Sequence, residues 1–302
     1  MANNDEESPW RNELEAVMRG FAGAFLFGAP FLYTMEVWWK GSFSSPPHML
    51  LSLVIAYAAL VVLDIRGGFR GGHARTLRRT LADSVEALAI ALLASTFGLL
   101  LIGVIGSGDG IQTICGQIIA EALPFSIGVG IANSVLHQED APQDETDDKP
   151  DEVTDDEEPP DATPSWFSQT WKATLADAGA SALGAVIIAA SISPTDEIPT
   201  IASVLTYPWL LILVAASLLL SYIIVFEAEF GRQSERRDQT GFFQSPLSET
   251  LVSYLISLGM ALLMLWLFRL VRPGDPLSQW VSYTIVLGFP ATIGGAAGRL
   301  AL

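Results

Sequence analysis

Residues 201–226 read IASVLTYPWLLILVAASLLLSYIIVF, and this apolar stretch contains no charged side chain. A helix needs about 20 mostly apolar residues to cross the hydrocarbon core of a bilayer, so the stretch predicts a transmembrane helix. Stretches of the same kind recur along the chain. Together they predict eight transmembrane helices, near residues 16–39, 48–65, 81–105, 111–136, 168–192, 201–226, 247–270 and 277–301. The expected fold class is therefore an all-α membrane protein.

The negative charge of the chain is concentrated in one segment. The 302 residues carry a net charge of −17, but thirteen of the 33 acidic residues lie between Glu139 and Asp161. Residues 138–165 have almost nothing apolar to bury, which predicts a disordered linker. A solvated tether is the simplest role for this linker, and weak binding of a divalent cation or a protein partner is the alternative. The chain lacks the basic surface that binding to nucleic acid requires.

The arginines predict how the helices are oriented. They cluster in two predicted loops, at residues 66–79 and 232–237, whereas the opposite loops carry only Lys40, Arg269 and Arg272. Loops rich in Lys and Arg stay on the cytoplasmic side of the membrane. The pattern therefore places both termini and the acidic linker in the cytoplasm, as expected of an inner-membrane protein.

An internal repeat occurs at a constant offset of 166 residues. LADS at residues 81–84 matches LSET at 247–250, and PFSIG at 124–128 matches PATIG at 290–294. The first two helices of each half align only with gaps. We predict two tandem four-helix repeats, residues 1–137 and 166–302, joined by the linker. An even number of helices per repeat makes the two repeats parallel, about a pseudo-twofold axis along the membrane normal.

The fourth and eighth predicted helices combine a central proline with small residues. Pro124 is followed by Gly128, and Pro290 by Gly294. Proline frees a backbone carbonyl, and interrupted helices at matching places in two repeats point to the binding site of a transporter. The alternative is close packing of helices through small residues.

Glu121 is the strongest single candidate for a functional residue. It lies about 15 Å into the fourth predicted helix at 1.5 Å per residue, which places it near the bilayer midplane. Its repeat partner is Leu287. An ionisable group at that depth is costly unless it faces a cavity, a partner or a bound cation. A protonated, hydrogen-bonded packing residue is the alternative.

Five further charged residues are weaker candidates. Arg19 and Asp177 could form an ion pair between the two halves, either as a structural salt bridge or as a gating pair. Asp83 and its repeat partner Glu249 lie in the first turns of their helices, where the dipole favours a carboxylate, or they line a cytoplasmic mouth. Glu36 lies near the outer interface, either solvated or as part of an acidic entrance that concentrates cations.

Residues 30–39, PFLYTMEVWW, close the first predicted helix. This segment resembles the first-helix signature of an uncharacterised family of bacterial integral membrane proteins. The resemblance implies a multi-pass membrane protein and brings no activity, substrate or catalytic residue with it.

These features favour a secondary transporter or channel for a proton or cation, with its path between the two repeats. Glu121 would bind the charge, and the fourth and eighth helices would line the path. The alternative is a membrane scaffold or sensor that presents the acidic linker to a partner. The chain contains no HExxH, GxSxG or GxxxxGK[ST] motif, so we expect neither an enzyme nor a cofactor or metal centre.

Overall fold

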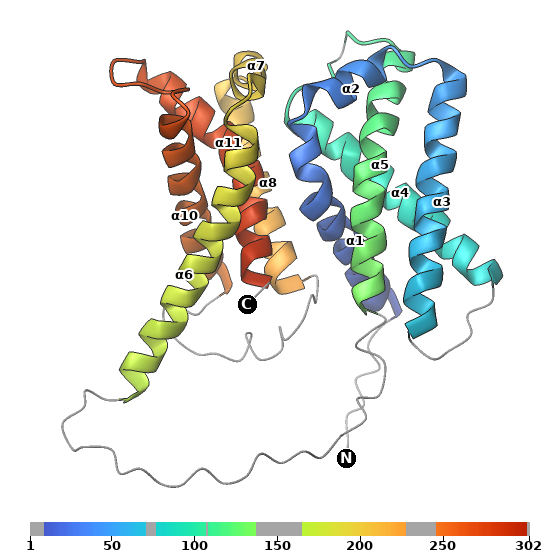
Figure 1. Ribbon diagram of the computed structural model, residues 1–302, viewed down its shortest axis with the longest axis horizontal. Coiled ribbons are helices and arrows are strands. Elements are labelled where there is room, and N and C mark those ends of the chain that lie inside the picture. The colour runs from blue at the N-terminus through green and yellow to red at the C-terminus, as the bar shows by residue number, and fades with distance from the viewer. Residues whose placement is uncertain (1–8, 71–76, 107, 137–164, 228–245, 301–302) are drawn as a thin grey trace, which may run out of the picture.

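The computed structural model describes residues 9–70, 77–106, 108–136, 165–227 and 246–300. Throughout these ranges the chain is helical, with short turns between helices and no strand. The acidic linker lies outside the described residues. The described helices form two bundles that stand side by side (Figure 1).

The first bundle contains the helices α1 (Pro9–Leu32), α2 (Met35–Ser42), α3 (Pro46–Arg70), α4 (Leu77–Leu101) and α5 (Ile111–Leu136). The second contains α6 (Ser165–Ile192), α7 (Glu197–Val204), α8 (Tyr207–Tyr222), a π-helical turn η1 (Ile223–Glu227), α10 (Pro246–Leu267) and α11 (Leu277–Leu300). Six of these helices are long and apolar enough to cross a membrane. The number rises to eight if each of two bent pairs counts as one span. The all-helical membrane fold is thus confirmed.

The first predicted helix, residues 16–39, is wrong as a continuous helix. It breaks at Tyr33 and Thr34, and α1 and α2 meet at 86°. Pro30 has no N–H to donate in the last turn of α1, and Thr34 is extended with φ −108° and ψ 90°. The indole of Trp38 then donates a hydrogen bond of 3.2 Å to the carbonyl of Leu32. The break is therefore capped from α2.

The second bundle has a matching bend, because α6 and α7 meet at 90°. The predicted helix 201–226 is also broken, since α7 ends at Val204 and α8 begins at Tyr207. Between them Thr206 is extended (φ −85°, ψ 160°), and a proline follows in the first turn of α8. The apolar pattern continues through this turn, so hydropathy did not reveal the break. Figure 1 shows α2 and α7 at the same end of the two bundles.

Each bundle is built around its last helix. Helix α5 packs against α1, α2, α3 and α4, and α11 packs against α6, α7, α8, η1 and α10. Residues 286–296 of α11 are buried without interruption, which covers about three turns on every side. A helix that is apolar all round is expected at such a central position. By contrast, only 17% of the most apolar part of α3 is buried, so this helix presents its surface to lipid.

The small residues pack helices within each bundle. A Cβ atom added at Gly23 of α1 would collide with Gly128 and Ala132 of α5. In the second bundle, a Cβ atom at Gly184 of α6 would collide with the backbone of Gly294 in α11. Glycine is required at these crossings because the helix backbones touch. Close packing is therefore what Gly128 and Gly294 provide.

The two bundles meet mainly through α1. This helix contacts η1, α11 and α6, and a smaller contact joins α4 to α8. At one end of the interface, the indole of Trp209 in α8 donates a hydrogen bond of 2.9 Å to the carbonyl of Leu101 in α4. Near the centre, the rings of Phe25 and Phe289 lie edge to face at 6.2 Å.

The expected meeting of the Pro124 and Pro290 helices needs correction. Among the described residues, α5 and α11 are not a helix pair in substantial contact, and α1 packs against both. Phe25 of α1 contacts Phe125, which follows Pro124, and Phe289, which precedes Pro290. Helix α1 fills the space between the two central helices because its small residues let it approach α5 so closely.

Candidate functional site

Glu121 lies in the interior of the first bundle. Its exposed fraction is 0%, and neither oxygen of its carboxyl group has a hydrogen-bond partner. One turn earlier on α5, Gln117 is 6% exposed and its Oε1 atom also lacks a partner. Two unsatisfied polar side chains therefore lie one turn apart on the same helix, whereas buried polar groups in proteins are nearly always hydrogen-bonded.

Two close contacts fix the level of Glu121 in the bundle. Gly116 packs against the backbone of Gly41 in α2, and the ring of Phe125 packs against Gly28 in α1. Glu121 lies between these two points on α5, so it is at the level of the break that separates α1 from α2. At the break itself, the N–H of Thr34 donates to the carbonyl of Phe31 at 2.8 Å and the N–H of Val37 donates to the carbonyl of Thr34 at 3.0 Å.

No described side chain neutralises Glu121. No ion pair or hydrogen bond joins it to any charged group that the structure describes. The same residues contain no cluster of three His, Cys, Asp or Glu side chains that could hold a metal ion. An isolated carboxylate at this depth is tolerated when it carries a proton or holds a cation.

On the side of Glu121 that is away from α2, the bundle is filled by phenylalanine rings. Phe25 lies edge to face with Phe125 at 5.3 Å and with Phe97 of α4 at 6.0 Å. Phe21 packs on Phe25 at 5.1 Å. We call Phe21, Phe25, Phe97, Phe125 and Phe289 the phenylalanine cluster. It joins α1, α4, α5 and α11 and forms an apolar layer one turn beyond the carboxyl group.

Tyr33, at the break between α1 and α2, has a specific role that the sequence did not predict. Its hydroxyl group is buried and donates a hydrogen bond of 2.7 Å to the carbonyl of Val286 in α11. In a regular helix the N–H of residue 290 would bind this carbonyl, but Pro290 has no N–H. Tyr33 thus supplies the donor that the proline removes. The freed carbonyl was predictable from Pro290, and its partner was not.

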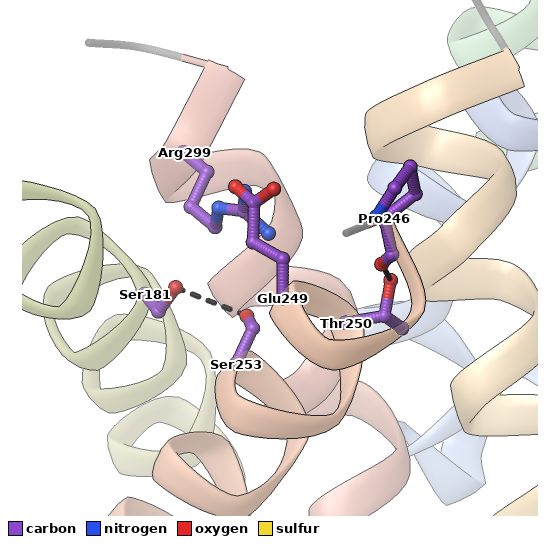
Figure 2. A network of polar contacts seen from close by, with 6 residues as sticks. All are labelled: Ser181, Pro246, Glu249, Thr250, Ser253 and Arg299. Carbon is purple, nitrogen blue, oxygen red and sulfur yellow. Dashed lines mark hydrogen bonds and ion pairs between the residues drawn. The ribbon is translucent and has the colours of Figure 1, made fainter. Parts of the chain in front are cut away.

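The second bundle contains a partly buried ion pair at the opposite end (Figure 2). Arg299 of α11 pairs with Glu249 in the first turn of α10, and the Arg299 side chain is only 1% exposed. The guanidinium carbon of Arg299 lies 5.8 Å from the ring centre of Phe226 in η1. One turn along α10, the hydroxyls of Ser181 and Ser253 are 3.0 Å apart. Glu249 is therefore neutralised by an arginine that sequence reasoning did not consider.

The other charged candidates lie apart from Glu121. Arg19 in α1, Asp177 in α6 and Asp83 in α4 are half-buried, and each takes part in a polar or ionic interaction. Glu36 is exposed in the first turn of α2. The pairing of Arg19 with Asp177 stays a prediction. The structure does not bring these residues together into one site with the Glu121 carboxyl group.

The long apolar helices, the lipid-facing surface of α3 and the two bent pairs define a multi-pass helical integral membrane protein. The chain belongs to the family described as "Putative integral membrane protein (DUF2391)", which matches residues 16–302. This match confirms the resemblance to a membrane-protein family inferred from residues 30–39. No curated protein and no solved structure matches the chain.

Proposed function

We propose that this membrane protein carries a proton or another small cation across the bilayer and that Glu121 binds it. The observation that carries the proposal is a fully buried carboxyl group without a partner on either oxygen. Stripping a carboxylate of water costs several kcal/mol unless a bound cation or proton compensates it. A side chain that needs a cation for its own stability is suited to pick one up and release it.

The surroundings of Glu121 support this role. Gln117 offers a third unsatisfied oxygen beside the two of Glu121. Pro124, one turn away, removes the N–H that would bind the carbonyl of Ala120. These groups give the first bundle a polar centre that a purely structural bundle does not need.

The proposal places the path inside the first bundle, along α5. In our interpretation the two bundles are tandem parallel repeats, and the matched order of helices and the two bends support this. Leu287, the repeat partner of Glu121, is fully buried and apolar. One repeat would then carry the ion site and the other would serve as its support. Asp83 and Glu36, near opposite ends of the first bundle, are candidates for the two mouths.

Transport can be tested with purified protein in liposomes. We expect it to dissipate a pH gradient or to pass a monovalent cation, and we expect Glu121→Gln to abolish this flux. Glu86→Gln is the matched control, because Glu86 is exposed on α4. Size-exclusion profiles of both variants check that they remain folded. Flux equal to that of empty liposomes across a panel of cations would rule the proposal out.

A second candidate function rests on the acidic linker. Its thirteen carboxylates suit a scaffold or sensor that presents residues 138–165 to a basic partner. Deleting these residues from the chromosomal gene should then abolish the phenotype of the intact gene while leaving liposome flux unchanged. Normal behaviour without the linker would count against the scaffold.

A further inference from the structure

A stripe of polar side chains leads along α5 from one end of the bundle to Glu121. Thr113, Gln117 and Glu121 are spaced four residues apart, so they lie on the same face of the helix. Thr113 is half-buried, Gln117 is 6% exposed and Glu121 is 0% exposed. Burial therefore increases steadily from the end of the bundle that carries α2 towards the carboxyl group.

On the other side of Glu121 the same face of α5 is apolar and sealed. The next residues on it are Phe125 and Val129, both fully buried. Phe125 is held in the phenylalanine cluster, and Gly128 touches the backbone of Gly23. The face formed by Phe125 and Val129 offers water no polar side chain, and the neighbouring hydroxyl of Ser126 is already bonded to the carbonyl of Leu123 at 2.7 Å, so a contact of this kind stays dry.

The site suits a proton better than a metal ion. Calcium and magnesium require six or more oxygen ligands. The stripe offers one carboxyl, one amide and one hydroxyl group, and the described residues hold no cluster of three His, Cys, Asp or Glu side chains. A proton needs only the carboxyl group. Hydronium would give its proton to a Glu121 oxygen and leave as water, and the reverse step would release the proton.

The helices packed on α5 carry their own charged groups. Those with described side chains are Glu13, Glu15 and Arg19 in α1, Glu36 and Lys40 in α2, His48 and Asp64 in α3, and Arg78, Arg79, Asp83 and Glu86 in α4. None of them forms a hydrogen bond or ion pair with Glu121 among the described residues. No hydrogen bond in the described structure therefore connects the carboxyl group to one of these side chains for a direct proton transfer.

We infer that Glu121 exchanges its proton with the end of the bundle that carries α2, by way of Gln117 and Thr113, while the phenylalanine cluster closes the opposite route. This inference rests on the proposed function, which supplies the reason why a proton would move through the protein. Helix α2 packs beside the stripe, because Gly41 packs directly on Gly116.

Cysteine accessibility in the full-length protein tests this directionality. Cys115 is exposed and is first replaced by alanine. Single cysteines are then introduced as Thr113→Cys, Gln117→Cys and Val129→Cys. Gly108→Cys reports the α2 end, because a Cβ atom at Gly108 meets nothing within 4 Å. A membrane-impermeant maleimide is added to either face in intact spheroplasts and in inverted vesicles.

We expect Thr113→Cys and Gln117→Cys to react only from the side that labels Gly108→Cys, with Gln117→Cys about tenfold slower. Val129→Cys should stay unlabelled from both sides. Labelling of Gln117→Cys from the opposite side would overturn the inference, and so would labelling of Val129→Cys at a higher rate than Gln117→Cys. If liposomes show no flux but this pattern holds, the transport proposal fails while the one-sided access stands.

Infrared difference spectra keep the inference testable if a cysteine variant does not fold. An acid step on the α2 side should increase the absorption of a protonated carboxyl group, and this change should be absent in Glu121→Gln. The same step on the opposite side should leave the band unchanged. A band that responds to the opposite side alone would contradict the assigned route.

Discussion

The hydroxyl group of Tyr33 donates a hydrogen bond of 2.7 Å to the carbonyl of Val286, 253 positions later in the chain. This bond joins the break between α1 and α2 to the centre of α11, one turn before Pro290. It completes the hydrogen bonding of a helix from which Pro290 has removed one donor. It also lies beside the contact of Phe25 with Phe289, so polar and aromatic contacts meet at the interface of the two bundles.

Removing this hydroxyl should destabilise the protein. In Tyr33→Phe the buried carbonyl of Val286 is left without its donor, which costs about 1–3 kcal/mol. The measurement is the thermal or denaturant unfolding of the detergent-solubilised protein. Tyr57→Phe is the matched control, because its bond of 3.0 Å to the carbonyl of Leu81 is exposed. Equal losses of stability in the two variants would show that burial does not make the Tyr33 hydrogen bond more important than the exposed Tyr57 bond.

Restoring the missing N–H should make Tyr33 less important. In Pro290→Ala the new amide at residue 290 can donate to the carbonyl of Val286. The cost of adding Tyr33→Phe should therefore be smaller in this background than in the natural protein, by about 1 kcal/mol in a double-mutant cycle. Additive effects would indicate that the tyrosine and the proline act independently.

The ion pair between Glu249 and Arg299 should be needed for the stability of the second bundle. In Glu249→Gln the buried guanidinium group of Arg299 loses the negative charge of Glu249, at a cost of about 3 kcal/mol. We expect a lowered unfolding midpoint, and little change in Glu86→Gln. The double variant Glu249→Gln with Arg299→Met should recover part of the loss. If Glu249→Gln unfolds like the natural protein, the pair is not a stability element.

Two glycines on α6 provide a matched test of helix crossing. A Cβ atom at Gly184 would collide with the backbone of Gly294, whereas one at Gly179 meets nothing within 4 Å. Gly184→Ala should therefore destabilise the protein by about 1–3 kcal/mol through overpacking. Gly179→Ala should be neutral or stabilising by up to about 1 kcal/mol, because alanine favours a helix. Unfolding midpoints in the same detergent compare them, and the reverse order would contradict the crossing.

The sequence predicted the bounds of two helices closely. Helix α10, Pro246–Leu267, lies within about three residues of the predicted helix 247–270, and α5 begins and ends where residues 111–136 were expected. The breaks at Thr34 and Thr206 were missed, because apolar residues continue on both sides of each break. Hydropathy reports the solvent around a residue and not the direction of the backbone.

The depth of Glu121 along α5 was also predictable, since it follows from the rise of a helix. Its lack of a partner was not, because any of four surrounding helices could have supplied one. The same holds for Arg299, whose partner lies on another helix. The sequence predicted an ion path at the interface of the two repeats. We propose a path inside the first bundle instead, because α1 lies between α5 and α11.

The sequence by itself therefore determined that this chain is a multi-pass helical membrane protein, because transfer of each segment into lipid depends on its own composition. Only the tertiary structure decided that Tyr33 caps the carbonyl freed by Pro290 and that Glu121 stays unpaired. Those outcomes depend on which helix faces meet, and close contacts between small residues far apart in the chain set those faces.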